Sequence, residues 1–404
     1  MIDTQKNVKP AMLKLLSYCR ANAWAGYDPY DALNSRLFSI FPVLNFRLPR
    51  LVLTQGLKRS PINVRGLLGI PKTQNPKALG LFLSALLKMS ETDVPDREQL
   101  VLYLIDRLQA LRSPGSTYSC WGYSFPWQTR KEVVPAGIPN LVCTTFVANA
   151  LLDAYDQTRD SRCLSMATSA AEYILNELYW TEGESIHGFC YPLPTLRSQT
   201  YNANFLGAAL LCRVSKLTGE GKFLGPAFAV TRCSVAKQKQ DGSWAYGGGS
   251  TKQWVDNFHT GFNLGALRAI GLHGQTDEFE NSLRRGFEYY RNHFFREDGV
   301  PKYFHNSTYP IDIHCVAQSI ITLTEFQDLD PTSLPMAEKV LQWAMENMWD
   351  ERGFFYYRVL RSLTIRTSYM RWSQAWMLFA LSSFLSDSVF RAADQRAHNS
   401  TVMA

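Results

Sequence analysis

The chain has 404 residues, of which 46% are hydrophobic, 13% aromatic and 19% charged. This composition provides ample apolar mass for a large core and excludes wholesale disorder. The formal charge is +7, and the excess lies in residues 1–80, which hold twelve Lys or Arg against three Asp or Glu. These basic residues belong to no recognised nucleic-acid-binding module, so we expect no nucleic-acid partner.

The N-terminal region, residues 1–64, is predicted to form a basic, apolar arm. Its segment 37–53 is apolar but broken by Pro42, Arg47, Pro49 and Arg50, which makes it too interrupted to cross a bilayer. The simplest interpretation is an arm that packs on the rest of the fold. The alternative is peripheral contact with a membrane, or with membrane-bound polysaccharide machinery, through residues 37–53.

The compartment is predicted from the first residues and the cysteines. Residues 1–14 contain no apolar run of the signal-peptide type, and none of the eight cysteines forms a C-x-x-C pair. We expect a cytoplasmic protein, with attachment at the inner membrane as the alternative for the arm.

A repeat runs through the last two-thirds of the chain. Glycine–aromatic turns recur at Gly122, Gly188, Gly242, Gly299 and Gly353, 54 to 66 residues apart. Such a regular period indicates stacked supersecondary units. After each turn and a polar loop comes a helix rich in small and aliphatic residues, at 145–151, 204–210, 261–267, 315–321 and 373–379.

The two helices of each unit have different apolar patterns. The small-residue helices are apolar on most sides, which predicts burial in an inner ring. Stretches 167–178 and 282–294 have a one-sided apolar stripe, which predicts an outer ring. An earlier unit is predicted from an inner helix near 75–83, with Pro76 in its first turn, and an outer partner at 98–111.

Six two-helix units with glycine–aromatic turns resemble the (α/α)6 toroids of six-hairpin glycosidases, uronate lyases, uronate epimerases and sugar 2-epimerases. We therefore predict an all-α fold: an (α/α)6 toroid over residues 65–390 with an N-terminal helical arm and a flexible C-terminal tail, 391–404. Residues 238–244 also match the Q-x-x-x-G-x-W turn of terpene-cyclase rings, where it has a structural role. The Asp-rich motif of the cyclases is missing. Residues 312–315 contain Asp, His and Cys, which are zinc-ligand types, but their spacing is not that of a zinc site. We expect no metal and no cofactor.

Polar and aromatic residues just before the inner helices are the candidate site, because equivalent loops of such a ring line one open end. The residues proposed as catalytic are His259, His314, Tyr201 and Tyr369. Tryptophans beside glycine turns are candidate walls for sugar stacking. The full substrate-binding set is Trp121, Tyr123, Arg197, Asn202, Trp244, Trp254, Asp256, Asn257, Asp312, Arg371 and Trp372. Some of these have a purely structural alternative: Asp312 suits a helix N-cap, and His259 a satisfied structural histidine.

Three chemistries and one non-catalytic role fit these residues. Uronate lysis or epimerisation would use His259 as base, a tyrosine as acid, and Asn or Arg side chains on the carboxylate. Sugar 2-epimerisation would pair His259 with His314. Glycoside hydrolysis would use Asp256 and Asp312 and ranks lower, because carboxylates are few in these loops. We predict an epimerase- or lyase-type enzyme acting on a saccharide, plausibly anionic, in polysaccharide biosynthesis or remodelling. A ring that binds a glycan or protein without catalysis remains the alternative.

Overall fold

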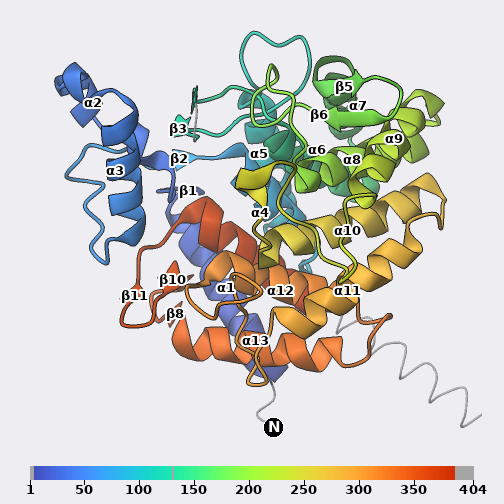
Figure 1. The fold of residues 1–404 in the computed structure, drawn as a ribbon. Helices are drawn as coiled ribbons and strands as arrows, with labels where there is room; N and C mark the ends of the chain where they lie inside the picture. Colours follow the sequence, from blue (N-terminus) through green and yellow to red (C-terminus); the bar gives the residue numbers. More distant parts are fainter. Residues whose placement is uncertain (1–3, 130–131, 387–404) are drawn as a thin grey trace, which may run out of the picture.

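Two concentric rings of helices dominate the computed structural model, which describes residues 4–129 and 132–386 (Figure 1). Each inner helix contacts the next, and the last contacts the first, so the ring closes. The inner ring consists of α4 (Pro76–Leu87), α6 (Leu141–Thr158), α8 (Tyr201–Thr218), α10 (Asn257–Gly274), α12 (Ile313–Glu325) and a final helix that begins as η6 (Met370–Ala375) and continues through residues 376–386. The predicted (α/α)6 toroid is confirmed.

The outer helices return the chain between successive inner helices. They are α5 (Arg97–Ala110), α7 (Ser161–Tyr173), α9 (Leu224–Val235), α11 (Glu280–His293) and α13 (Ser333–Asn347). The sixth place is taken by α1 (Thr4–Ala21), which packs against η6 and contributes Leu15, Leu16 and Cys19 to the main core. The two ends of the described chain thus form one hairpin of the ring.

Burial follows the two apolar patterns. All twelve residues of α4 are buried, as expected for a helix surrounded by others. By contrast, α11 buries Leu283, Gly286, Phe287 and Tyr290, which lie on one face, and exposes Arg284 and Glu288. The inner ring is therefore packed on all sides, while each outer helix shields one side of it.

Capping residues fix where the inner helices begin. Asn75, Asn140, Asp256 and Asp312 are the N-caps of α4, α6, α10 and α12, and each side chain accepts a backbone N–H of the first turn. Such caps satisfy donors that a helix start otherwise leaves unpaired. They place the first turns of the inner helices, and the loops before them, at defined positions.

The glycine turns are sterically required. Gly242 has a φ of +90°, and a Cβ there would lie 2.3 Å from the carbonyl oxygen of Arg285. Gln238 donates from Nε2 to the carbonyls of Gly242 and Ser282, both at 2.9 Å. The Gln238–Trp244 motif therefore has the structural role in this chain that its resemblance implies.

Short antiparallel strand pairs join the helices. They are β3 (Trp127–Gln128) with β4 (Val133–Val134), β5 (Tyr179–Glu182) with β6 (Ile186–Phe189), β8 (Trp349–Asp350) with β9 (Phe354–Phe355), and a three-stranded sheet of β7 (Ile311–Asp312), β10 (Arg358–Val359) and β11 (Thr364–Ile365). In that sheet Arg358 lies opposite Asp312. The remaining short elements are η3 (Ile174–Leu178), η4 (Gly221–Phe223) and η5 (Ser250–Lys252).

The N-terminal arm is divided by the structure. Because α1 lies in the ring, the part that projects is residues 27–70, with η1 (Asp31–Asn34), α2 (Leu37–Ile40), η2 (Pro42–Leu44) and α3 (Arg47–Arg59) (Figure 1). It has its own small cluster of Ala32, Leu57 and Ile70. The strands β1 (Ala25–Gly26) and β2 (Thr73–Gln74) pair at its base. The predicted tail, 391–404, lies outside the described residues, within which no helix is long and apolar enough to cross a membrane.

Candidate functional site

The first turns of several inner helices meet at one end of the ring. The ring of Phe258, at the start of α10, lies 4.6 Å from that of His314 on α12 and 5.8 Å from that of Trp372 on η6. Lys77, at the start of α4, adds to the electrostatic field at His314. Loops from distant parts of the chain thus converge on one cluster, as the repeat predicts.

An Asp–His pair is the most organised polar feature of this cluster. Nδ1 of His259 lies 2.7 Å from Oδ2 of Asp256, which also accepts the indole N–H of Trp254 at 3.1 Å. A carboxylate accepts and does not donate, so Nδ1 carries the proton. In the neutral ring Nε2 is then the basic nitrogen, and no described residue hydrogen-bonds it. The His259 side chain is 21% exposed, so Nε2 is placed to accept a proton from a bound molecule.

Aromatic rings flank this histidine. Tyr246 stacks on Trp254 with ring centroids 4.6 Å apart and planes inclined by 14°, and its edge meets the His259 ring at 4.7 Å. Burial is the main cause that raises the pKa of Tyr246 well above its ordinary value, so its hydroxyl stays protonated. A stacked aromatic pair beside a base is the arrangement that a sugar ring would use.

His314 occupies a different environment, although it also lies in the first turn of an inner helix, one repeat later. Its side chain is 1% exposed and contacts Phe258, Trp372 and Trp376 with centroids 4.5 to 4.6 Å away. Burial holds its pKa well below the ordinary value, and Lys77, Arg371 and His259 lower it further. Neither ring nitrogen has a hydrogen-bond partner in the described structure. Buried polar groups are paired in nine cases of ten or more, so this position stands out.

Asp312 fixes the wall behind His314. Oδ1 caps the His314 backbone N–H at 2.9 Å and accepts the indole N–H of Trp372 at 2.8 Å. Oδ2 accepts from Nε of Arg358 at 2.9 Å. The carboxylate is fully buried, and these bonds fix its position. Asp312 therefore has the cap role and also positions a wall of the site.

The arm completes the mouth of the site. Asp28 accepts from Nε and Nη2 of Arg371 at 2.7 and 2.8 Å, and both side chains are buried. The Arg371 guanidinium lies 4.9 Å from the ring centroid of Tyr123. Tyr30, also from the arm, contacts the Trp372 ring at 5.5 Å. Arg371, Trp372 and Tyr123 are thus brought together, with two arm residues beside them that sequence reasoning did not identify.

Lys77 is the other group that sequence reasoning missed. Its ammonium lies 4.0 Å from the ring centroid of Phe146, 5.2 Å from that of Trp376 and 5.3 Å from that of Phe262. No described carboxylate forms a salt bridge with it. Burial, followed by the nearby Arg371, holds its pKa well below the ordinary value. The available signal was a single lysine in the otherwise apolar segment 76–87.

Three predicted residues take packing positions between inner and outer helices. The indole N–H of Trp121 donates to the carbonyl of Leu108 at 2.8 Å, and that of Trp244 to the carbonyl of Ser234 at 3.1 Å. Asn257 is fully buried and bonds Ser319 on α12 and Tyr290 on α11. These contacts connect the two rings and lie outside the cluster around His259.

The other four predicted residues lie at the start of α8, in the loop before it and directly before η6. Tyr201 and Asn202 are buried at the start of α8, and Oδ1 of Asn202 has no partner in the described structure. Tyr369 is buried beneath Arg65 of the arm, whose guanidinium lies 4.8 Å from its ring. Arg197 is exposed over Trp180. Within the described residues no side-chain hydrogen bond joins these four to His259, and their assigned roles remain predictions.

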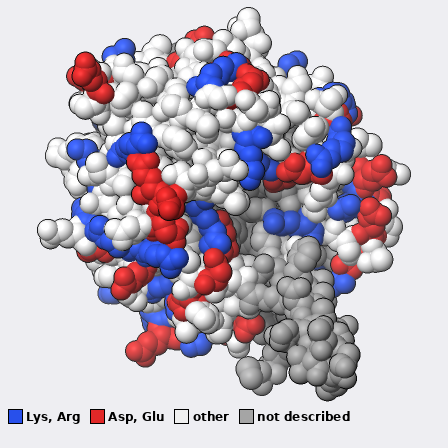
Figure 2. Space-filling view, turned by 90° about the vertical axis from the view of Figure 1, so that its right-hand side faces the viewer, with Lys and Arg blue, Asp and Glu red and all other residues white. Residues whose placement is uncertain are grey.

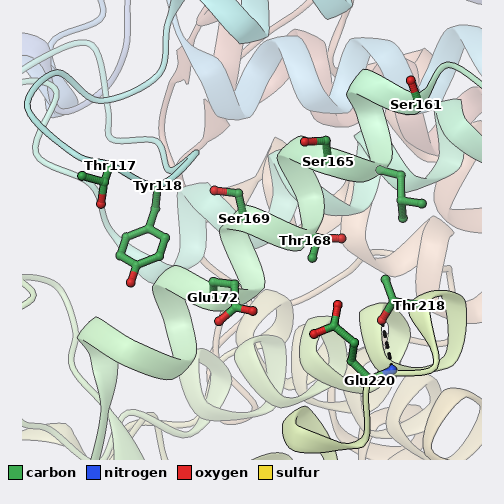
Figure 3. Close-up of a pocket in the computed structure, with 10 residues that line it drawn as sticks. Thr117, Tyr118, Ser161, Ser165, Thr168, Ser169, Glu172, Thr218 and Glu220 are labelled. Atoms are coloured by element: carbon green, nitrogen blue, oxygen red, sulfur yellow. Dashed lines mark hydrogen bonds between the residues drawn. The ribbon is translucent and has the colours of Figure 1, made fainter.

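A groove of about 630 Å³ lies elsewhere, on the outside of the ring. Hydroxyl side chains of α7 and the end of α8 line it, and Glu172 and Glu220 face it (Figure 3). Both glutamates pair with Lys222. The groove is open and contains none of the predicted site residues.

The described ranges contain no candidate metal site, because no group of three or more His, Cys, Asp or Glu in them is placed to hold an ion.

Comparison with known proteins identifies the fold. No protein-family model matches the sequence, and no curated protein sequence is significantly similar. Solved structures do match. The cellobiose 2-epimerase of Bacillus thermoamylovorans has 12% identity and a TM-score of 0.60, covering 80% of this chain and 90% of its own. A polysaccharide lyase has 9% identity and a TM-score of 0.59, covering 95% and 98%.

A third neighbour widens the range of chemistries on this fold. The unsaturated glucuronyl hydrolase of Streptococcus agalactiae has 12% identity and a TM-score of 0.56, covering 95% of this chain and 90% of its own. The fold of this chain is therefore that of carbohydrate-active (α/α)6 toroids.

Proposed function

We propose that the chain is a carbohydrate-active enzyme of the epimerase or lyase type, in which His259 removes a proton from a sugar carbon. The observation that carries this proposal is the Asp256–His259 pair, which leaves Nε2 unbonded beside the stacked rings of Tyr246 and Trp254. A sugar ring on this platform would present a C–H bond to Nε2. Solved structures with this fold include an epimerase and a lyase, the two reaction types proposed here.

The proton balance separates the two reaction types. In both, Nε2 of His259 takes a proton from a carbon next to a carbonyl or carboxyl group, and the electron pair moves toward that group's oxygen. In an epimerase a proton returns to the other face of the same carbon. In a lyase the substituent on the next carbon leaves with its bonding electron pair and takes up a proton to become a hydroxyl group, and a C=C double bond remains. The products therefore distinguish the two.

Hydrolysis by Asp256 and Asp312 is less favoured by the contacts of these carboxylates. Asp256 already accepts from His259 and Trp254, and Asp312 from Arg358, Trp372 and a backbone N–H. A general acid must donate from a carboxyl oxygen to the glycosidic oxygen, whereas the oxygens of both carboxylates already accept hydrogen bonds from protein donors.

An anionic sugar is the substrate class that we propose. Lys77 and Arg371 place two basic groups at the buried centre of the cluster, and among the described acidic residues Asp28 pairs with Arg371, while none pairs with Lys77. A substrate carboxylate near Lys77 would favour its charged form. Uronate-containing oligosaccharides, as in polysaccharide remodelling, have this chemistry.

The test is proton exchange in deuterated water. The protein is incubated with cellobiose and, separately, with uronate-containing oligosaccharides, and deuterium at sugar carbons is followed by NMR. Ultraviolet absorbance of a new C=C bond reports lysis. We expect deuterium incorporation or unsaturation that falls roughly 10²- to 10⁴-fold in His259→Gln, the range for removing a general base.

The matched control is His293→Gln. His293 lies on outer helix α11, where Nδ1 contacts the carbonyl of Tyr289 at 3.0 Å, so its loss should leave turnover unchanged. Sugars that raise the melting temperature without any exchange or cleavage would instead support a binding ring.

A further inference from the structure

The outer side of the arm carries a concentrated set of exposed apolar side chains. Of the sixteen exposed large hydrophobic residues among the described ones, eight lie within residues 40–67. Val43, for example, is 78% exposed. We define the arm patch as the six of these on α2, η2, α3 and the loops between them: Ile40, Phe41, Val43, Phe46, Leu48 and Val52.

The arm's own packing does not use these side chains. Helix α3 buries Thr54 and Leu57, and Leu57 joins the small cluster with Ala32 and Ile70. Leu48 and Val52, four residues apart, share the solvent face of the same helix. The arm therefore has a satisfied inner face and an unpartnered apolar outer face. Exposed apolar side chains concentrated in one short segment mark candidate interaction sites.

Charge identifies the partner. Residues 37–70 contain five Lys or Arg and no Asp or Glu. Arg65 is buried against Asp31, whereas Arg47 and Arg59 are exposed. The side of the molecule away from the arm, in contrast, carries Lys and Arg interleaved with Asp and Glu (Figure 2). Cations without neighbouring acids beside the arm patch are complementary to an anionic surface.

The shape favours a lipid surface over a protein. The arm lies beside the ring, with α2 at its outer tip (Figure 1). A projecting tip with phenylalanine and aliphatic side chains can enter the boundary between lipid headgroups and acyl chains, while the arginines remain at the headgroups. A protein partner would need a groove to receive it. We propose that the arm patch binds the surface of an anionic lipid bilayer.

Vesicle co-sedimentation of the full chain tests this proposal independently of any sugar chemistry. The probes are phosphatidylcholine vesicles with and without phosphatidylglycerol, at low and high salt. We expect binding to the anionic vesicles only, weakened by salt. Arg47→Gln should weaken it about fivefold, the effect of one basic residue near an anionic surface. The triple variant Phe41→Ser, Val43→Ser, Phe46→Ser should abolish it.

The matched control is Leu272→Ser. Leu272 is 63% exposed, like the patch residues, but lies near the end of α10 in the ring. It should leave vesicle binding unchanged, and circular dichroism should show all variants folded. A folded wild-type protein that stays in the supernatant with anionic vesicles overturns the proposal. So does a dimer, seen by sedimentation velocity without lipid, that the triple variant dissociates, because the patch would then be an interface between copies.

Discussion

One carboxylate contacts the same histidine at two points: Oδ1 of Asp256 accepts the backbone N–H of His259 at 3.0 Å, and Oδ2 lies 2.7 Å from Nδ1 of its ring. Asp256 thus starts helix α10 and orients the imidazole. The helix start and the direction of Nε2 are linked, because both depend on one buried side chain that is 3% exposed. A substitution at Asp256 that keeps the helix cap but removes the carboxylate can therefore separate the two roles.

Asp256→Asn should leave the fold intact and reduce activity. Asparagine still caps a helix, so the free energy of unfolding should fall by less than about 2 kcal/mol. The amide does not stabilise an imidazolium as a carboxylate does, so turnover on a sugar should fall roughly 10²-fold or more. Urea unfolding and the deuterium assay measure the two effects.

Asp160→Asn is the control for an N-cap that lies away from the cluster and that also pairs with Arg162. Asp160 caps outer helix α7 by accepting the backbone N–H of Arg162 at 2.9 Å. Its loss should change stability by a similar small amount and leave turnover unchanged. Equal turnover in Asp256→Asn and the wild type would contradict the proposed role of His259 as the base.

Buried His314 should make the stability of the folded chain depend on pH in the acid range. Burial lowers its pKa in the folded chain, while the unfolded chain has the ordinary value of about 6.5. As pH falls below about 6.5, the unfolded state binds the proton more readily, so the folded state loses stability. His314→Phe, which keeps an aromatic ring among Phe258, Trp372 and Trp376, should reduce this loss in thermal melts between about pH 7 and pH 5.

A second histidine provides the comparison for that measurement. Burial, with Arg213 and Lys216, lowers the pKa of His273 to about 4, so it contributes acid sensitivity of the same sign. His273→Leu should therefore also flatten the melting curve against pH, but without affecting sugar binding. An unchanged acid sensitivity in His314→Phe would show that this histidine accepts a proton in the folded chain.

The fold could be predicted from the sequence because its signals are local and repeated. Gly242 needs its left-handed φ, and the buried segment 76–87 differs from the one-sided stripe of 280–293, so period and pattern agree. The sixth outer helix could not be found in this way. Residues 4–21 complete the hairpin of the last inner helix, and this pairing joins the two ends of the chain.

The site could be predicted only where it follows the repeat. The sequence singled out His259, His314, Asp312, Arg371 and Trp372 because they lie at the starts of inner helices, and their roles remain predictions. Asp28 and Tyr30 were missed because tertiary packing brings them from the arm. Trp121 and Trp244 illustrate the opposite error of pattern reasoning: a tryptophan beside a glycine turn can face the cleft or the space between rings, and only packing decides which.

Lys77→Met should stabilise the protein at neutral pH and impair recognition of anionic sugars. Burial lowers the Lys77 pKa in the folded chain, so wild-type stability should rise with pH from that lowered value up to about 10.4, the ordinary lysine pKa. Methionine fills similar space among Phe146, Phe262 and Trp376 without a charge to desolvate. Melts at pH 7 and about pH 9 should show a smaller rise in the variant.

The sugar preference of this variant provides the second readout. Neutral sugars should bind Lys77→Met about as well as wild type, whereas uronate-containing ones should lose affinity. Equal loss for both classes would indicate a general packing defect. Unchanged affinity for both would contradict a contact between Lys77 and a substrate carboxylate.

The Asp28–Arg371 pair should couple the arm to the ring. Both side chains are buried, so Asp28→Asn leaves an arginine charge without its counter-ion, which typically costs about 3–5 kcal/mol. Adding Arg371→Met removes the stranded charge and should recover much of that loss. Urea unfolding of the two single variants and the double variant gives the coupling energy.

The exposed pair Arg296–Asp298 supplies the control, since Asp298→Asn should cost no more than about 1 kcal/mol. If Asp28→Asn costs no more than that control, the arm is attached to the ring chiefly by other contacts, such as the pairing of β1 with β2.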